Sequence, residues 1–131
     1  MAEGADRFLV YVAGMLGISY EVVLPMAKSL YMKDFSKHSK LEFEKLLKEA
    51  KSVCVIELYA GNTNRLIKEN STYRSFQYRQ VGREIVDSCD EMIIMSDGIK
   101  NQKMGGTEDI AGYAKLHEKF IYNIPCQKVY I

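Results

Sequence analysis

The residues best suited to chemistry lie between positions 91 and 114, in the segment EMIIMSDGIKNQKMGGTEDIAGYA. An apolar run ends there in an acidic residue and a glycine, and a Gly-Gly-Thr turn precedes two more acidic residues. In order, these are Asp97, Gly98, Gly105, Gly106, Thr107, Glu108 and Asp109. A strand followed by a glycine turn and a helix start presents backbone N–H groups and carboxylates at one edge of a sheet. Small polar ligands bind at such edges.

Each of these residues also has a purely structural interpretation. Acidic residues in the first turn of a helix interact favourably with the helix dipole, by roughly 0.3–1 kcal/mol. Thr107 is an ordinary helix N-cap, Asp97 and Gly98 suit a simple turn, and the two glycines supply positive φ in a loop. Both interpretations of the segment stay open at this point.

The elements that must position these residues alternate between apolar segments and segments of helical period, which is typical of an α/β fold. Strands are expected at residues 8–14, 52–59, 91–97 and 119–124, with a short last strand at 128–131. The first is predicted to be buried on both faces because its apolar residues do not alternate with polar ones. Helices are expected at residues 21–32, 39–50, 73–89 and 108–118, the second of them capped by Ser39 with Glu42 three residues later. Residues 60–72 are expected to form a loop.

Parallel strands need crossover helices, and these crossovers are right-handed. The sequence therefore predicts a three-layer sandwich with a flavodoxin- or Rossmann-like open parallel sheet of four to five strands. Ligands bind beyond the carboxyl ends of such strands. Gly14 and Asn62 are expected to meet the 97–109 segment at that edge. Tyr11 is a candidate for stacking on a base or donating to a carboxylate, and a core position in its strand explains it as well.

Length and composition predict one domain over residues 1–131, with residues 1–6 flexible. The apolar fraction is 47%, the charged fraction 27% and the net charge +1, so no charge excess suggests a nucleic acid or membrane partner. No apolar run is long enough to cross a membrane, and the N-terminus does not match a signal peptide, so a cytoplasmic location is expected. Three widely spaced cysteines are expected to be reduced core thiols. His38 and His117 lack partners at metal-ligand spacing, so neither a metal nor a cofactor is expected.

Two segments resemble the nucleoside 2-deoxyribosyltransferase-like family, which includes deoxynucleoside 5′-monophosphate N-glycosidases. One is YVAG at residues 11–14, and the other runs from IVDSCDEMIIMS at residues 85–96 through Gly-Thr and a carboxylate to Gly-Tyr-Ala. The resemblance implies a flavodoxin-like sheet that holds a nucleoside or nucleotide. It also implies a homo-oligomer, because family sites borrow residues from a neighbouring subunit.

The resemblance further implies a carboxylate nucleophile on the helix after Gly-Thr. Aligning the family's small-residue steps on Ala111 and Tyr113 places Asp109 in that position. Breaking an N-glycosidic bond builds positive charge on the sugar, which a carboxylate stabilises or captures. Asp97 is then the candidate for assisting the departing base, and Glu108 competes for either role. The N–H groups of residues 105–107 are candidates for holding a phosphate or a sugar hydroxyl.

Other functions fit the same sequence. A non-catalytic nucleotide-binding module, acting as a sensor or decoy, would use the same fold and edge. A cytokinin-activating-type phosphoribohydrolase shares only the Gly105-Gly106-Thr107 turn. Arg65, Arg74 and Arg79 interleave with aromatic residues and suit either a phosphate-and-base site or one face of an amphipathic helix. A plain interaction protein also remains open.

Overall fold

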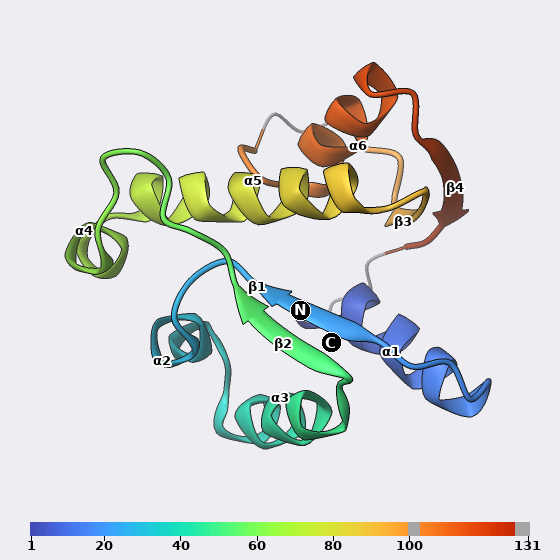
Figure 1. The fold of residues 1–131 in the computed structure, drawn as a ribbon, viewed down its shortest axis with the longest axis horizontal. Coiled ribbons are helices and arrows are strands. Elements are labelled where there is room, and N and C mark those ends of the chain that lie inside the picture. The colour runs from blue at the N-terminus through green and yellow to red at the C-terminus, as the bar shows by residue number, and fades with distance from the viewer. Residues whose placement is uncertain (100–102, 128–131) are drawn as a thin grey trace. The chain divides into compact units, whose positions relative to one another are not determined.

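The computed structural model describes residues 1–99 and 103–127, and over these residues the chain is an α/β protein with short parallel strands. It divides into two compact units, Met1–Glu57 and Leu58–Ile131. Each unit contains one two-stranded parallel sheet (Figure 1). The α/β class predicted from the sequence is confirmed, and the described strands pair as two sheets of two, so the predicted open sheet of four to five strands is not seen among them.

The first unit contains four helical segments and two strands. These are α1 (Ala5–Met15), β1 (Glu21–Leu24), α2 (Lys28–Tyr31), the 3-10 helix η1 (Met32–Asp34), α3 (Lys37–Glu49) and β2 (Ser52–Val55). The strands β1 and β2 pair in parallel, with Val22 opposite Val53 and Leu24 opposite Val55. The helix α3 is therefore part of the crossover between the two strands, as parallel pairing requires.

The first strand predicted from the sequence is wrong, because residues 8–14 lie inside α1. Phe8, Tyr11, Val12 and Met15 fall at i, i+3, i+4 and i+7, which is the period of a helix. The small and apolar residues between them hide this period in a short window. Residues 5 and 6, expected to be part of a flexible start, already belong to α1.

The helix predicted at residues 21–32 is also wrong in its first half, which forms β1. Val22 and Val23 are β-branched and suit a strand, and Pro25 disfavours a helical conformation at Leu24. Helix α3 confirms the prediction at residues 39–50 but begins earlier. The Ser36 side chain accepts from the Ser39 N–H at 3.2 Å, so Ser36 is the N-cap and the predicted cap Ser39 is inside the helix.

The core of the first unit joins α3 to the segment after β1. Phe43 and Leu46 of α3 are buried, as are Leu24 and Met26. The Phe43 ring lies 5.2 Å from the ring of Phe35, measured between centroids. This aromatic contact holds α3 against the short helical turns that follow β1.

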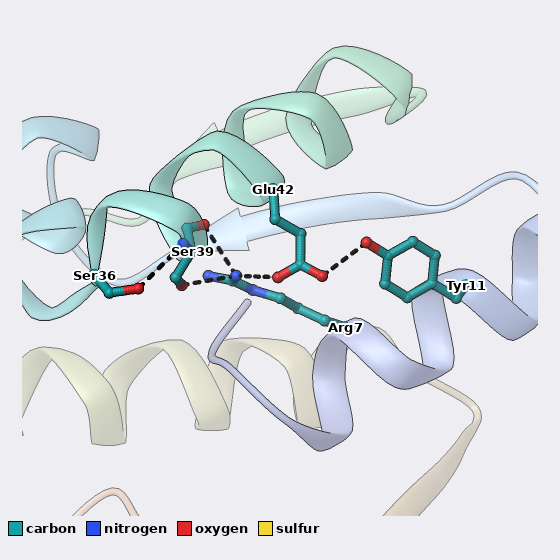
Figure 2. A network of polar contacts seen from close by, with 5 residues as sticks. All are labelled: Arg7, Tyr11, Ser36, Ser39 and Glu42. Atoms are coloured by element: carbon teal, nitrogen blue, oxygen red, sulfur yellow. Dashed lines mark hydrogen bonds and ion pairs between the residues drawn. The ribbon is translucent and has the colours of Figure 1, made fainter.

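Arg7 of α1 is the buried cation of this unit, at 3% exposure. Its Nη1 donates to the Ser39 carbonyl at 3.0 Å, to Ser39 Oγ at 2.9 Å and to Glu42 Oε2 at 2.6 Å. Tyr11, one turn further along α1, donates from its hydroxyl to Glu42 Oε1 at 2.7 Å (Figure 2). The guanidinium also lies 4.7 Å from the centre of the Phe35 ring. These contacts fix α1 against α3 within the unit.

The second unit contains α4 (Asn64–Glu69), α5 (Ser71–Ser88), β3 (Glu91–Ser96), α6 (Thr107–Leu116) and β4 (Phe120–Pro125). The predicted third and fourth helices and third and fourth strands are confirmed as α5, α6, β3 and β4. The predicted loop at residues 60–72 instead contains α4 and the start of α5. Thr63 and Asn70 cap these helices through side-chain bonds to the N–H groups of Leu66 and Thr72. The short last strand predicted at residues 128–131 lies outside the described residues.

One face of the β3–β4 pair packs against helices α5 and α6. Val86 of α5 and Ile110 and Ala114 of α6 form a buried cluster, against which Met92 of β3 and Ile121 of β4 pack. The strands are parallel and in register, with Met92 opposite Ile121. Their carboxyl ends therefore meet at one edge of the pair, where Ser96 lies opposite Pro125.

The Glu42 carboxylate gives a pH-dependent prediction for the first unit. The hydrogen bonds from Arg7 and Tyr11 hold the pKa of Glu42 below its ordinary value of 4.5. This stabilisation is therefore complete above about pH 4.5 and is lost as pH falls through the lower folded-state pKa. At pH 7, Glu42→Gln is expected to lower the free energy of unfolding by about 1–2 kcal/mol. Urea unfolding of the full chain, followed by circular dichroism, measures the difference.

The difference in free energy of unfolding between wild type and Glu42→Gln is expected to become smaller below pH 4.5. Glu44→Gln is the matched control, because Glu44 lies on the same helix in an exposed ion pair with Lys28, and such pairs contribute little. A difference in free energy of unfolding that stays constant between pH 3 and pH 7 would contradict this role for the Glu42 carboxylate.

Candidate ligand pocket at the ends of β3 and β4

Strand β3 ends in a turn held by its own side chains. The Gly98 N–H donates to Ser96 Oγ at 3.1 Å, and the Ile99 N–H donates to Asp97 Oδ1 at 3.0 Å. Gly98 has a φ of 77°, which favours glycine. The sequence prediction that Asp97 and Gly98 end a strand is confirmed, and the structure fixes how the chain turns there.

An open pocket of about 550 Å³ lies at this edge. It is lined by residues 96–98 at the end of β3, and by Asn123 and residues 125–127 at the end of β4. The two walls are joined where the Cys126 N–H donates to the Ser96 carbonyl at 3.0 Å. The pocket therefore lies beyond the carboxyl ends of two parallel strands, where ligands bind in α/β proteins.

Glu108 contacts the pocket wall through Ser96. The Ser96 hydroxyl donates to Glu108 Oε1 at 2.7 Å. Glu108 is in the first turn of α6, so this bond ties the start of the helix to the end of β3. Glu108 therefore lies close to the end of the strand that precedes Asp97, as predicted.

Asp109 bonds to two partners that do not line the pocket. Its Oδ2 accepts from the Gly105 N–H at 2.8 Å and from Arg79 Nε at 2.8 Å. Burial by itself would raise the pKa of Asp109, but the Gly105 N–H and the Arg79 guanidinium outweigh it and hold that pKa below its usual value. Asp109 is thus ionised and paired, and it is not among the residues that line the pocket.

The Gly-Gly-Thr turn lies directly against helix α5. Gly105 has a φ of 76°, and a Cβ atom there would lie 2.7 Å from the Arg79 backbone nitrogen and 2.9 Å from the Tyr78 carbonyl carbon. The Gly105 N–H is donated to Asp109, and the Gly106 N–H to the Lys103 carbonyl at 3.0 Å. These two amides therefore satisfy bonds inside the turn. Gly106, and not Thr107, is the N-cap residue of α6.

The remaining predicted site residues have structural partners. Asn62 is buried, and its Nδ2 donates to the Tyr73 carbonyl at 2.9 Å and to Gln77 Oε1 at 3.0 Å, which fixes the loop before α4 to α5. Tyr11 is on helix α1, not on a strand, and donates to Glu42. Gly14 is on the same helix. Tyr11 and Gly14 thus belong to the first unit, and the other predicted site residues to the second.

The sequence predicts no binding role for five residues that line the pocket: Ser96, Asn123, Pro125, Cys126 and Gln127. A usable signal exists for the last four, because a parallel strand at residues 119–124 must end at the same edge as the strand at 91–97. The sequence indicates Arg79 only as one cation of an aromatic-rich helix. Its partner Asp109 is 30 positions away in the chain, so no local pattern indicates the pair.

The structure also bears on metal binding, on the state of the cysteines and on membrane-spanning helices. Among residues 1–99 and 103–127, no group of three His, Cys, Asp or Glu side chains is arranged to hold a metal ion. The three cysteines are free thiols, but the prediction that all are core residues is wrong, because Cys54 is exposed. In the same part of the chain, no helix is both long and apolar enough to span a membrane.

Comparison with known proteins gives no relative for this chain: no family model, curated protein or solved structure matches it.

Gly105 provides a sharp test of the turn against α5. Gly105→Ala is expected to lower the free energy of unfolding by roughly 2–4 kcal/mol, since it adds backbone strain at positive φ and a clash with a helix backbone. Gly112→Ala is the matched control, because Gly112 lies inside α6 with nothing within 4 Å of an added Cβ. That control is expected to stabilise the protein by up to about 1 kcal/mol. Thermal and urea unfolding measure the stability of both variants. Equal changes in the free energy of unfolding would contradict the close approach of Gly105 to the α5 backbone.

Proposed function

We propose that the second unit binds a nucleoside or nucleotide in the pocket at the carboxyl ends of β3 and β4. The observation that carries this proposal is the pocket itself. It lies at the carboxyl edge of a parallel strand pair, and its lining residues include Asp97, the hydroxyl residue Ser96 and the amide residues Asn123 and Gln127. Its volume of about 550 Å³ suits a ligand of nucleoside size.

The chemistry of the lining supports a sugar and a base as the two parts of the ligand. A carboxylate at the end of a parallel strand accepts hydrogen bonds from sugar hydroxyls in many nucleotide-binding sites. The amides of Asn123 and Gln127 each offer donors and an acceptor, which suit the polar edge of a base. The resemblance of residues 85–96 and of the Gly-Thr turn to the nucleoside 2-deoxyribosyltransferase-like family supports the same ligand class.

A second candidate is catalysis at this pocket, with cleavage or transfer at the N-glycosidic bond. The observation that favours it is the closeness of carboxylates to the pocket: Asp97 lines it, and Glu108 reaches its wall through Ser96. A carboxylate facing the anomeric carbon stabilises the developing positive charge or captures the sugar. In this candidate Asp97 faces the sugar, whereas Asp109 acts as nucleophile only if it leaves Arg79 and Gly105.

From the sequence we also propose that the chain forms one domain with an open sheet of four to five strands and assembles into a homo-oligomer. We propose further that it is cytoplasmic and acts on a small molecule without a cofactor. The nucleoside pocket requires only the β3–β4 pair and α6, so the binding test below does not depend on these further proposals.

Binding is tested by titrating the full chain with deoxynucleosides, ribonucleosides and their 5′-monophosphates and following backbone amides by NMR. The ligand is expected to shift the amides of Gly98 and Cys126. Asp97→Asn is expected to weaken binding about tenfold, by the loss of a charge-assisted hydrogen bond. Asp90→Asn, just before β3 at the other end of the strand, is the control and is expected to keep wild-type affinity. No binding by any compound would refute the proposal, as would equal losses in the two variants.

Catalysis is tested by incubating the same compounds with the protein and measuring free base by chromatography. If Asp97 faces the sugar, Asp97→Asn is expected to reduce base release by roughly 10²-fold or more, and Asp109→Asn much less once its lower stability is corrected for. Nucleoside binding without base release would exclude the catalytic candidate and leave a binding module. Loss of base release in Asp109→Asn alone would identify Asp109 as the nucleophile.

A further inference from the structure

The hydrogen bonds of Ser96 fix what its hydroxyl can offer to a ligand. A serine hydroxyl has one proton and two lone pairs. The proton is donated to Glu108 Oε1 at 2.7 Å, and one lone pair accepts the Gly98 N–H at 3.1 Å. Since Ser96 lines the pocket, the hydroxyl has only an acceptor left to present there.

Asp97, the next residue, adds acceptors to the same pocket. Its Oδ1 accepts the Ile99 N–H at 3.0 Å, which sets the orientation of the carboxylate. A carboxylate offers about four acceptor positions and no donor. Ser96 and Asp97 both line the pocket, so their side chains bring acceptor oxygens and no spare proton to the end of one strand.

We infer that Ser96 and Asp97 form an acceptor pair that selects ligands by their hydrogen-bond donors, with sugar hydroxyls as those donors, and that Glu108 is the positioning residue that fixes this polarity. The choice of a nucleoside sugar rests on the proposed function. A phosphate has acceptor oxygens and negative charge, so next to this pair it is disfavoured. In a bound nucleotide the phosphate points away from Ser96 and Asp97.

The position of Glu108 supports this role. The neighbouring residue, Asp109, bonds to Gly105 and Arg79 and so holds the first turn of α6 against α5. Glu108 is carried by the same turn and reaches Ser96. Asp109 thus fixes the start of α6, and Glu108, which is held in place by that turn, orients the Ser96 hydroxyl.

The inference is tested by the affinity ratio between a 2′-deoxynucleoside and the matching 2′,3′-dideoxynucleoside, which lacks the 3′-hydroxyl donor. The wild-type full chain is expected to bind the 2′-deoxynucleoside about tenfold more tightly than the 2′,3′-dideoxynucleoside. Glu108→Ala removes the acceptor that holds the Ser96 proton, which can then turn into the pocket, and the ratio is expected to fall to about threefold or less. Glu108→Gln keeps an acceptor oxygen and is expected to restore most of the ratio.

A purely structural role for Glu108 would weaken both ligands equally and leave the ratio unchanged, which would overturn the inference. Glu84→Ala is the control, because Glu84 is exposed on α5, and it is expected to keep the wild-type ratio. Circular dichroism and unfolding curves for each variant establish that the fold is retained before ratios are compared.

A second measurement separates this inference from the proposed function. Methyl β-riboside and inorganic phosphate are titrated separately into the full chain while the Gly98 and Cys126 amides are followed by NMR. Shifts with the riboside and none with phosphate at equal concentration would support the acceptor pair even if no nucleoside binds. Shifts with phosphate as large as those with the riboside would overturn it.

Discussion

The close approach of Gly105 to the backbone of α5 is the constraint on which the second unit depends. There is no room for a side chain between this residue and the backbone of residues 78 and 79. The Gly105 N–H is bonded to Asp109, and the same carboxylate oxygen is paired with Arg79. A single carboxylate thus joins the turn, the start of α6 and the middle of α5, and the cost of burying its charge is offset by an ion pair and an amide.

The pocket follows from that arrangement. Once the first turn of α6 is fixed on α5, Glu108 is placed where it accepts the Ser96 proton. Ser96 in turn accepts the Gly98 N–H and so shapes the turn that carries Asp97. The parallel register of β3 and β4 supplies the opposite wall, since Ser96 and Pro125 lie opposite one another at the strand ends. Helix packing, strand register and the polarity of one hydroxyl are therefore linked within the second unit.

Local patterns in the sequence predicted much of the second unit and less of the first. Helix α5 and strand β3 both appear within two residues of their expected bounds. Residues 8–14 are too short and too uniformly apolar for their period to separate a strand from a helix, and β1 is only four residues long. The pairing of strands into two sheets of two depends on contacts between distant segments, which no local window contains.

The candidate site shows the same division between local and distant information. Asp97 and Gly98 directly follow a strand, and a local rule is sufficient to place them at the edge where the pocket lies. The Gly-Gly-Thr turn looked like an anion-binding cradle because its sequence is compatible with one. The first glycine of the turn, Gly105, is required instead by its close approach to the α5 backbone at residues 78 and 79. Only the tertiary structure shows that two of its amides are already used.

Glu108 and Asp109 show why residue type alone does not assign a role. In the sequence both are acidic residues of a helix start, and the dipole argument applies to both; the family resemblance implies a nucleophile at Asp109, with Glu108 as a competitor. In the structure one is committed to a cation and an amide, and the other to a hydroxyl at the pocket. Asp97 is the acidic residue among those that line the pocket, and its Oδ1 accepts the Ile99 N–H. The number of acidic residues near a ligand edge therefore says less about chemistry than the partners that each oxygen already has.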